Sequence, residues 1–147
     1  MHIRPAEAYE LIDLRNAVLR PGLPRALAMF PGDSDPSTRH FAAEHDGAIV
    51  GCVTLRLSDW NNEPAWQLRG MAVAPLHQRR GIGAQLVAVM ERSIRESPAD
   101  VPRLLWCNAR VPAVAFYERQ GWDVASREFE IPHSGPHVQM VKRIENC

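Results

Sequence analysis

The sequence of 147 residues lacks the features that mark secreted, membrane-spanning and nucleic-acid-binding proteins. Its three cysteines form no C-x-x-C pair and its histidines lack metal-ligand spacing, so we expect neither disulfides nor a metal site. No apolar run approaches the roughly 18 residues of a membrane span. Lysine plus arginine and aspartate plus glutamate number 17 each, so no excess of positive charge favours nucleic acid or an anionic membrane. We expect a soluble, cytoplasmic protein.

The patterns that are present predict one domain, 1–147, of the α/β class. Asp46-Gly47 lies between two strand-like runs and indicates a hairpin. Gly121 is placed to end a helix that opens near Pro112. Apolar periodicity predicts strands over 2–4, 40–45, 48–57, 65–73, 104–109, 122–124, 127–131 and 137–143, and helices over 6–19, 83–96 and 112–121. Such an order favours a mixed, mostly antiparallel twisted sheet with helices on both faces.

The strand over 65–73 changes phase partway along its length. Strand alternation places Trp66 and Leu68 on one face. It places Met71 and Val73 on the opposite face. Gly70 stands at the change. A β-bulge there would let both pairs face inward and would splay this strand from its neighbour.

The most informative stretch is Gln78-Arg79-Arg80-Gly81-Ile82-Gly83, between that strand and an amphipathic helix. Its two glycines let the backbone turn tightly and approach a ligand closely. The helix that follows opens with unpaired N–H groups and the positive end of its dipole, so the stretch predicts a pyrophosphate site. A second segment, 25–39, is rich in proline, glycine and aspartate. We expect a mobile loop there, near the substrate.

Three elements together resemble the GNAT N-acetyltransferase superfamily over about two-thirds of the chain. They are the strand that ends in Met71-Ala72-Val73, the Gln78-x-x-Gly81-x-Gly83 loop with its helix, and Asn108 followed by Ala115-Phe116-Tyr117-Glu118-x-x-Gly121-Trp122. The resemblance implies that the cofactor is acetyl-CoA. Since the sequence offers no placed nucleophile, we expect direct transfer of the acetyl group to a primary amine in a ternary complex. The resemblance also implies that the splayed strands admit acetyl-CoA.

The resemblance assigns roles to individual residues. Tyr117 is the expected general acid for the departing thiolate. Asn108 is expected to contact the cofactor or support the splayed strands. The strand residues would carry the pantetheine arm and the thioester, and the loop would bind the pyrophosphate; the expected cofactor-binding residues are Met71, Ala72, Val73, Gln78, Arg79, Arg80, Gly81, Ile82, Gly83, Ala84 and Asn108.

Several points stay open at this stage. The amine must lose a proton before it attacks, and no spacing selects one base among four candidates: Glu63, His40, Glu128 and His137. Tyr117 could instead be a core aromatic residue, and Arg79 with Arg80 a solvated turn. Cys107 is better explained as a small buried residue than as a nucleophile. The alternatives in function are an inactive CoA-binding sensor or a transferase of a longer acyl group, and the acceptor amine and a homodimer remain unassigned.

Overall fold

The computed structural model describes residues 1–145, which form two compact units. Unit 1 comprises Met1–Arg56 with Arg69–Met90, and unit 2 comprises Leu57–Leu68 with the residues from Glu91 onward. The expected mixed α/β fold is confirmed, because eight strands within the described residues form a mostly antiparallel sheet accompanied by helices. Cys147 lies outside the described residues.

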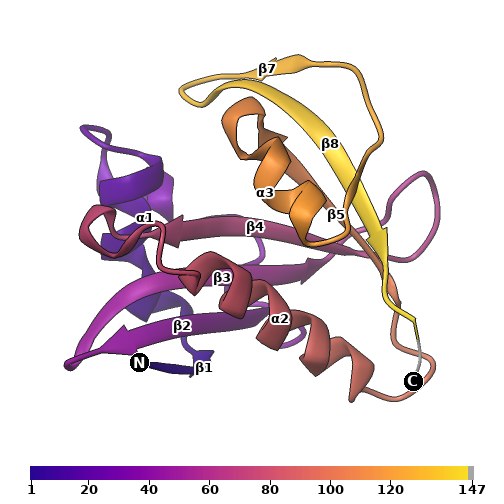
Figure 1. Cartoon of the computed structure of the whole chain (residues 1–147), viewed down its shortest axis with the longest axis horizontal. Coiled ribbons are helices and arrows are strands. Elements are labelled where there is room, and N and C mark those ends of the chain that lie inside the picture. Colours follow the sequence, from indigo (N-terminus) through magenta and orange to yellow (C-terminus); the bar gives the residue numbers. More distant parts are fainter. Residues whose placement is uncertain (146–147) are drawn as a thin grey trace. The chain divides into compact units, whose positions relative to one another are not determined.

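Unit 1 contains a three-stranded antiparallel ribbon. Its strands lie side by side in chain order (Figure 1): β1 (His2–Ala6), β2 (Arg39–His45) and β3 (Ala48–Leu57). Asp46 and Gly47 have φ values of 50° and 79°. Two successive left-handed residues are what the tight turn of a two-residue hairpin requires, so the predicted hairpin is confirmed.

Helices cover both faces of the sheet in unit 1. They are η1 (Ala8–Leu11), α1 (Ile12–Leu19) and the first part of α2 (Ile82–Arg95). Cys52 packs in a buried cluster with Leu11, whereas a Cβ built on Gly51 would lie 3.0 Å from Ile82 and 3.1 Å from Leu86. Neighbouring strand residues point to opposite faces, so the helices before and after β3 lie on opposite sides. Gly51 lets α2 pack closely.

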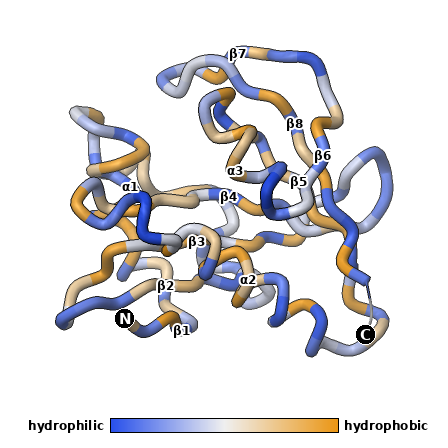
Figure 2. The backbone as a smooth tube through the Cα atoms, viewed as in Figure 1, coloured by the Kyte–Doolittle hydropathy of each residue, from blue (hydrophilic) through white to orange (hydrophobic). Residues whose placement is uncertain are grey.

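The amphipathic pattern of α2 is confirmed. Hydrophobic and hydrophilic residues alternate along this helix (Figure 2), and the four expected apolar residues are all buried: Leu86, Val87, Met90 and Ile94. Two short 3₁₀ turns also occur in unit 1, at η2 (Arg25–Ala28) and η3 (Pro75–His77). No helix within residues 1–145 has the length and apolar character needed to cross a membrane.

Unit 2 is built around β5 and β8, which pair antiparallel over seven residues. Its elements are β5 (Leu104–Arg110), η4 (Val111–Ala113), α3 (Val114–Arg119), β6 (Asp123–Val124), β7 (Phe129–Ile131) and β8 (Gly135–Arg143). Gly121, at φ 90°, follows the last turn of α3. It ends that helix as predicted, because a left-handed residue allows the final carbonyls to be capped.

The strand β4 (Trp66–Val73) runs from unit 2 into unit 1. Its first three residues pair in parallel with Leu105 and the next two residues of β5. Gly70 then takes φ 65°, a backbone conformation that disrupts a regular strand and that glycine adopts without penalty. The irregularity falls where the sequence predicted a change of phase.

Candidate active site

The turn before α2 has the backbone that a phosphate site needs. Arg79 and Gly81 both adopt left-handed conformations, with φ 64° and 78°. The first helical hydrogen bond of this turn joins the N–H of Gln85 to the carbonyl of Gly81, at 3.0 Å. The amides of Gly81 to Ala84 therefore precede the first residue with an i−4 acceptor in the helix. They are available as a group of donors for an anion.

Positive side chains flank this turn without a counter-charge. Arg79 and Arg80 are exposed, and within residues 1–145 neither forms a hydrogen bond or an ion pair. Cations are disfavoured beside the positive end of a helix dipole. The Gln78 side chain donates to the carbonyl of Val73 at 3.0 Å and so ties the turn to the end of β4. A bound anion would offset the charge concentrated here.

The expected inward orientation of Met71 and Val73 is wrong. Ala72 is the buried residue of this segment, packed with Leu11 and Cys52, whereas Met71 and Val73 are half-buried. The small alanine fits where α1 lies against the strand. The two larger side chains are consequently left partly exposed on either side of it.

Gly70 is required at its position for two reasons. It is left-handed, and a Cβ added there would lie 3.1 Å from the Phe30 ring and 3.2 Å from Nε of Arg15. The carbonyl of Gly70 accepts from the Cys52 thiol at 3.4 Å. Side chains of α1, β3 and the 25–39 segment therefore all meet β4 at this residue.

Tyr117 is on α3 in unit 2 and is 6% exposed. Its ring packs edge-on against Phe116 and Trp122, with centroids 5.1 and 5.5 Å away. Burial raises the pKa of the phenol well above its usual value, and Cys107 adds to the effect. The side chain is thus both a packed aromatic residue and a group that stays protonated at neutral pH.

Asn108 is half-buried on β5, opposite Gln139 of β8. Its Oδ1 accepts a long hydrogen bond, 3.4 Å, from the Gln139 side chain. The contact supports the pairing of these two strands, while the expected contact with a cofactor remains a prediction.

The two acidic candidates for the base differ in their surroundings. Glu63 forms a two-pronged ion pair with Arg143, at 2.6 and 2.8 Å. Hydrogen bonding from Arg143 lowers the pKa of this carboxyl, which makes it a poorer proton acceptor. Glu128 is exposed on the segment between β6 and β7.

The two histidine candidates are both buried but differ in their free atoms. His40 contacts Thr54 through Nδ1 at 2.8 Å and the carbonyl of Asp33 through Nε2 at 2.9 Å, so both ring nitrogens are used. His137 contacts the carbonyl of Gly135 through Nδ1 at 2.7 Å. With a proton on Nδ1, its Nε2 is left as an acceptor with no partner among the described residues.

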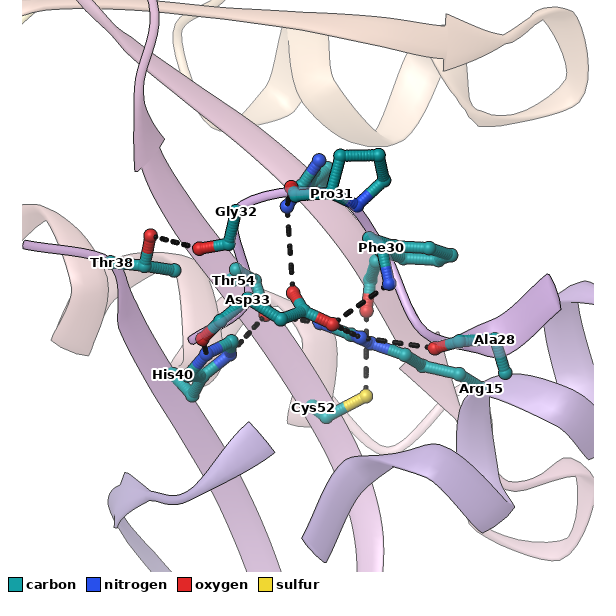
Figure 3. Close-up of polar contacts among 12 residues, drawn as sticks. Arg15, Ala28, Phe30, Pro31, Gly32, Asp33, Thr38, His40, Cys52 and Thr54 are labelled. Atoms are coloured by element: carbon teal, nitrogen blue, oxygen red, sulfur yellow. Dashed lines mark hydrogen bonds and ion pairs between the residues drawn. The ribbon is translucent and has the colours of Figure 1, made fainter. Parts of the chain in front are cut away.

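A buried ionic cluster in unit 1 was not anticipated from the sequence (Figure 3). Arg15 of α1 is fully buried. It donates to both carboxylate oxygens of Asp33, at 2.7 and 3.3 Å, to Thr54 at 2.8 Å and to the carbonyl of Ala28 at 3.1 Å. The guanidinium also stacks on the Phe30 ring, 4.2 Å from its centroid. The sequence feature that could have indicated this cluster is Arg15 itself, a charged residue one helical turn after Leu11 on the apolar side of α1.

Asp33 connects the 25–39 segment to the strands. Its carboxylate accepts from the Phe30 N–H at 2.9 Å and from Arg69 of β4 at 3.4 Å. Burial raises the pKa of this carboxyl, but the hydrogen bonds from Arg15 and the Phe30 N–H outweigh it and leave the pKa below its ordinary value. The segment is therefore anchored at its middle rather than free, which corrects the expectation of a mobile loop.

The remaining reactive groups are buried thiols. Burial raises the pKa of both Cys52 and Cys107 to about 12, so neither is a thiolate at neutral pH. In the part of the chain that the structure describes, no cluster of three or more histidine, cysteine or acidic residues is arranged to hold a metal ion.

The site residues fall into two groups. The β4 residues from Met71 to Val73 and the turn from Gln78 to Ala84 belong to unit 1, whereas Asn108 and Tyr117 belong to unit 2. Within unit 1 the end of β4 and the turn are linked directly by the Gln78 side chain. Within unit 2, Tyr117 follows Asn108 through the short η4 turn.

Comparison with known proteins identifies the family. The model of the acetyltransferase (GNAT) family matches residues 6–122. The uncharacterized N-acetyltransferase YitI of Bacillus subtilis is 23% identical over 147 residues, covering 98% of this chain and 97% of its own. An aminoalkylphosphonate N-acetyltransferase of Salmonella typhimurium is 28% identical over 90 residues, covering 60% of this chain and 58% of its own.

Solved structures share the fold. Escherichia coli ElaA aligns with a TM-score of 0.81 at 16% identity, covering 97% of this chain and 100% of its own. An aminoglycoside 6'-N-acetyltransferase complexed with coenzyme A aligns with a TM-score of 0.73 at 15% identity, covering 100% and 99%. The protein described here is therefore a member of the acetyltransferase (GNAT) family, an N-acetyltransferase enzyme.

Proposed function

We propose that this enzyme transfers the acetyl group of acetyl-CoA to a primary amine by direct attack in a ternary complex. The observation that carries the proposal is the left-handed turn before α2, with its run of helix-opening amides and two arginines that have no partner within residues 1–145. A Cβ on Gly81 would meet no atom within 4 Å, so the space above the turn is open to a ligand. The proposed unit of function is a single domain, 1–147.

The cofactor residues are assigned by the chemistry of coenzyme A. Main-chain amides from Gln78 to Ala84 would bind the diphosphate, with Arg79 and Arg80 adding charge-assisted contacts. The amide-bearing pantetheine arm would pair with β4 over Met71–Val73, and a backbone N–H there would polarise the thioester carbonyl. Asn108 is assigned to the cofactor by family resemblance.

Tyr117 is proposed as the general acid that protonates the departing thiolate. Burial raises the pKa of this phenol, so the acidic form is fully populated at neutral pH. Proton transfer depends on the difference between the pKa of the phenol and the pKa of the coenzyme A thiol. Burial raises the pKa of a thiol as well, as the value of about 12 for Cys107 illustrates. A thiolate expelled into similar surroundings would be correspondingly basic and able to take the proton.

Direct attack is favoured over a covalent acyl-enzyme. An acyl-enzyme needs an activated nucleophile, and burial keeps both described thiols protonated by raising their pKa to about 12. Among the candidate bases, His137 has a ring nitrogen available to accept the proton of an ammonium. Glu63 is held by Arg143 and His40 is engaged at both nitrogens.

The proposed acceptor is a small molecule or peptide that presents a primary amine. The Salmonella relative acts on aminoalkylphosphonates by its name, and these are small primary amines. Two functions remain as outcomes of the test: binding of coenzyme A without catalysis, and transfer of a longer acyl group.

The test measures release of free coenzyme A from acetyl-CoA across a library of amines. We expect amine-dependent release, and Tyr117→Phe should lower kcat by about 10²–10⁴-fold while acetyl-CoA still binds. Tyr9→Phe, at an exposed residue, is the control. Tight binding of acetyl-CoA without release for any amine would indicate the sensor, and faster turnover with propionyl- or succinyl-CoA would indicate the longer acyl group.

A further inference from the structure

Three arginines converge on the turn at 31–33 in unit 1. Arg15 reaches it from α1 and Arg69 from β4. Arg56, at the end of β3, lies over Gly32, since a Cβ built on that glycine would be 2.6 Å from its Nε. A glycine at this position therefore makes room for a third guanidinium over the turn.

The nearby carboxylates do not satisfy all three cations. Asp33 is committed to Arg15, at 2.7 and 3.3 Å, and contacts Arg69 only at 3.4 Å. Arg69 also donates to the carbonyl of Pro31. Its Nε is buried without a partner among the described residues. Burial lowers the pKa of Arg69, Asp33 opposes the shift, and the charges of Arg56 and Arg15 reinforce it.

Arg56 has the donors to bind an external ligand. In the described part of the chain its guanidinium forms no hydrogen bond and no ion pair within 4 Å. The carboxylate of Asp35 acts on it only through space, and accepts instead from the N–H and hydroxyl of Ser37. A half-buried guanidinium with five free donors beside a second one is suited to an oxyanion.

We propose that Arg56 and Arg69 bind an anionic group on the acceptor, a carboxylate or a phosphonate. The inference rests on the proposed function, because it names the class of amine that the same site would acetylate. Arg69 precedes Met71 by two residues, with the left-handed Gly70 between them, so their Cα atoms are at most about 7 Å apart. An acid bound there would therefore place a short amino acid or aminoalkylphosphonate near the β4 residues assigned to the thioester.

The charge of this site also separates the acceptor classes. Polyamines and aminoglycosides carry several positive charges, and a second cation near Arg56 and Arg69 would be repelled. An acceptor with one amine and one acid gains two charge-assisted contacts instead. The site thus favours small zwitterionic amines over polycationic ones.

The experiment compares matched acceptors with acetyl-CoA and the full chain. The acceptors are 3-aminopropanoate, 2-aminoethylphosphonate and 3-aminopropanamide, which has the amine but an uncharged amide in place of the acid. We expect kcat/KM for the better of the two acids to exceed that of the amide by about 10- to 100-fold. Arg56→Gln should lower kcat/KM for the acids to about the value for the amide. The comparison of the two acids distinguishes recognition of a carboxylate from recognition of a phosphonate.

The control variant is Arg25→Gln. Arg25 lies in the 25–39 segment that contains Asp33, but its side chain is 55% exposed and pairs with Asp13, so Arg25→Gln should leave the preference for acids unchanged. Equal kcat/KM for acids and amide in the wild type would overturn the inference, and so would a preference that survives in Arg56→Gln.

A binding measurement separates this inference from the proposed function. Propylphosphonate and propanoate have the acid but no amine, and their affinities are measured by calorimetry with coenzyme A present. Binding of either that weakens at least tenfold in Arg56→Gln supports the anion site even if no amine is acetylated, an outcome that would overturn only the proposed function. Binding unchanged by Arg56→Gln would overturn the anion site alone.

Discussion

Arginines of unit 1 lie in two opposite kinds of surroundings. Arg15 is fully buried, and its charge is matched by Asp33, Thr54 and a carbonyl. Arg79 and Arg80 are exposed at the opening of α2 with no partner among the described residues. The fold therefore uses the first charge to fix a loop, and leaves the others available for a ligand.

The largest effect is expected from Asp33→Ala. Removing this carboxylate leaves Arg15 as a buried charge without its counter-ion, which typically costs about 3–5 kcal/mol of unfolding free energy. Chemical denaturation measures the loss. Asp13→Ala is the matched control, because Asp13 also pairs with an arginine at 2.8 Å but is exposed. Its denaturation midpoint should fall only slightly, since Asp13 lies in the first turn of α1. Similar midpoints for the two variants would contradict the structural role of the buried pair.

The same carboxylate predicts a dependence of stability on pH. Arg15 and the Phe30 N–H hold the pKa of Asp33 below its ordinary value of 3.8. Stability from this group is therefore fully present above the unfolded pKa and is lost as pH falls through the lower, folded pKa. Denaturation between pH 2 and 6 should show this acid loss in the wild type, and a smaller one in Asp33→Asn. An identical pH profile for the two proteins would contradict the assignment.

A smaller effect, on binding, is expected from Gly81→Val. A β-branched residue resists φ 78° and would block the approach of a diphosphate to the main-chain amides. Calorimetry should show at least about a 100-fold loss of affinity for acetyl-CoA, which corresponds to about 2.7 kcal/mol. Gly47→Val is the matched control, since Gly47 has φ 79° and equally open surroundings. If both variants bind alike, strain and not the site explains the result.

Loss of the exposed charges should have a moderate effect. Arg79→Gln with Arg80→Gln should weaken acetyl-CoA binding about tenfold and flatten its dependence on salt, because the main-chain donors remain. The denaturation midpoint should stay the same or rise slightly, since two cations leave the positive end of the α2 dipole. A fall in stability without loss of affinity would show that these arginines serve the fold.

The smallest effect is expected from Glu63→Gln. This carboxylate pairs with Arg143 at an exposed position, where ion pairs contribute little. We expect kcat to change by less than about twofold. The denaturation midpoint should change by no more than the experimental error. A large fall in kcat, together with the loss of one protonation step from the pH profile of kcat, would identify Glu63 as the base after all.

Much of the fold could be predicted because its signals are local. The Asp46-Gly47 turn, the apolar stripe of α2 and the glycine that ends α3 each act through neighbouring residues, and all three are confirmed. Gly70 was placed correctly as an irregularity, but its consequence was not. The burial of Ala72 depends on how closely α1 packs on β4, which strand alternation does not contain.

The buried cluster could not be predicted for the same reason. Arg15 and Asp33 are 18 residues apart, and neither lies in a recognisable motif. Only the tertiary fold brings them together with Arg69 and Arg56. The turn from Gln78 to Gly83, by contrast, is one continuous stretch, so the spacing of its glycines alone predicts its backbone conformation.

The most direct test follows the main-chain N–H resonances of Gly81 to Ala84 while coenzyme A is added to isotopically labelled protein. If the turn binds the diphosphate, these four amides will shift most, and they will stop shifting at the stoichiometric point. Saturable binding of coenzyme A that leaves all four resonances in place would contradict this role of the turn.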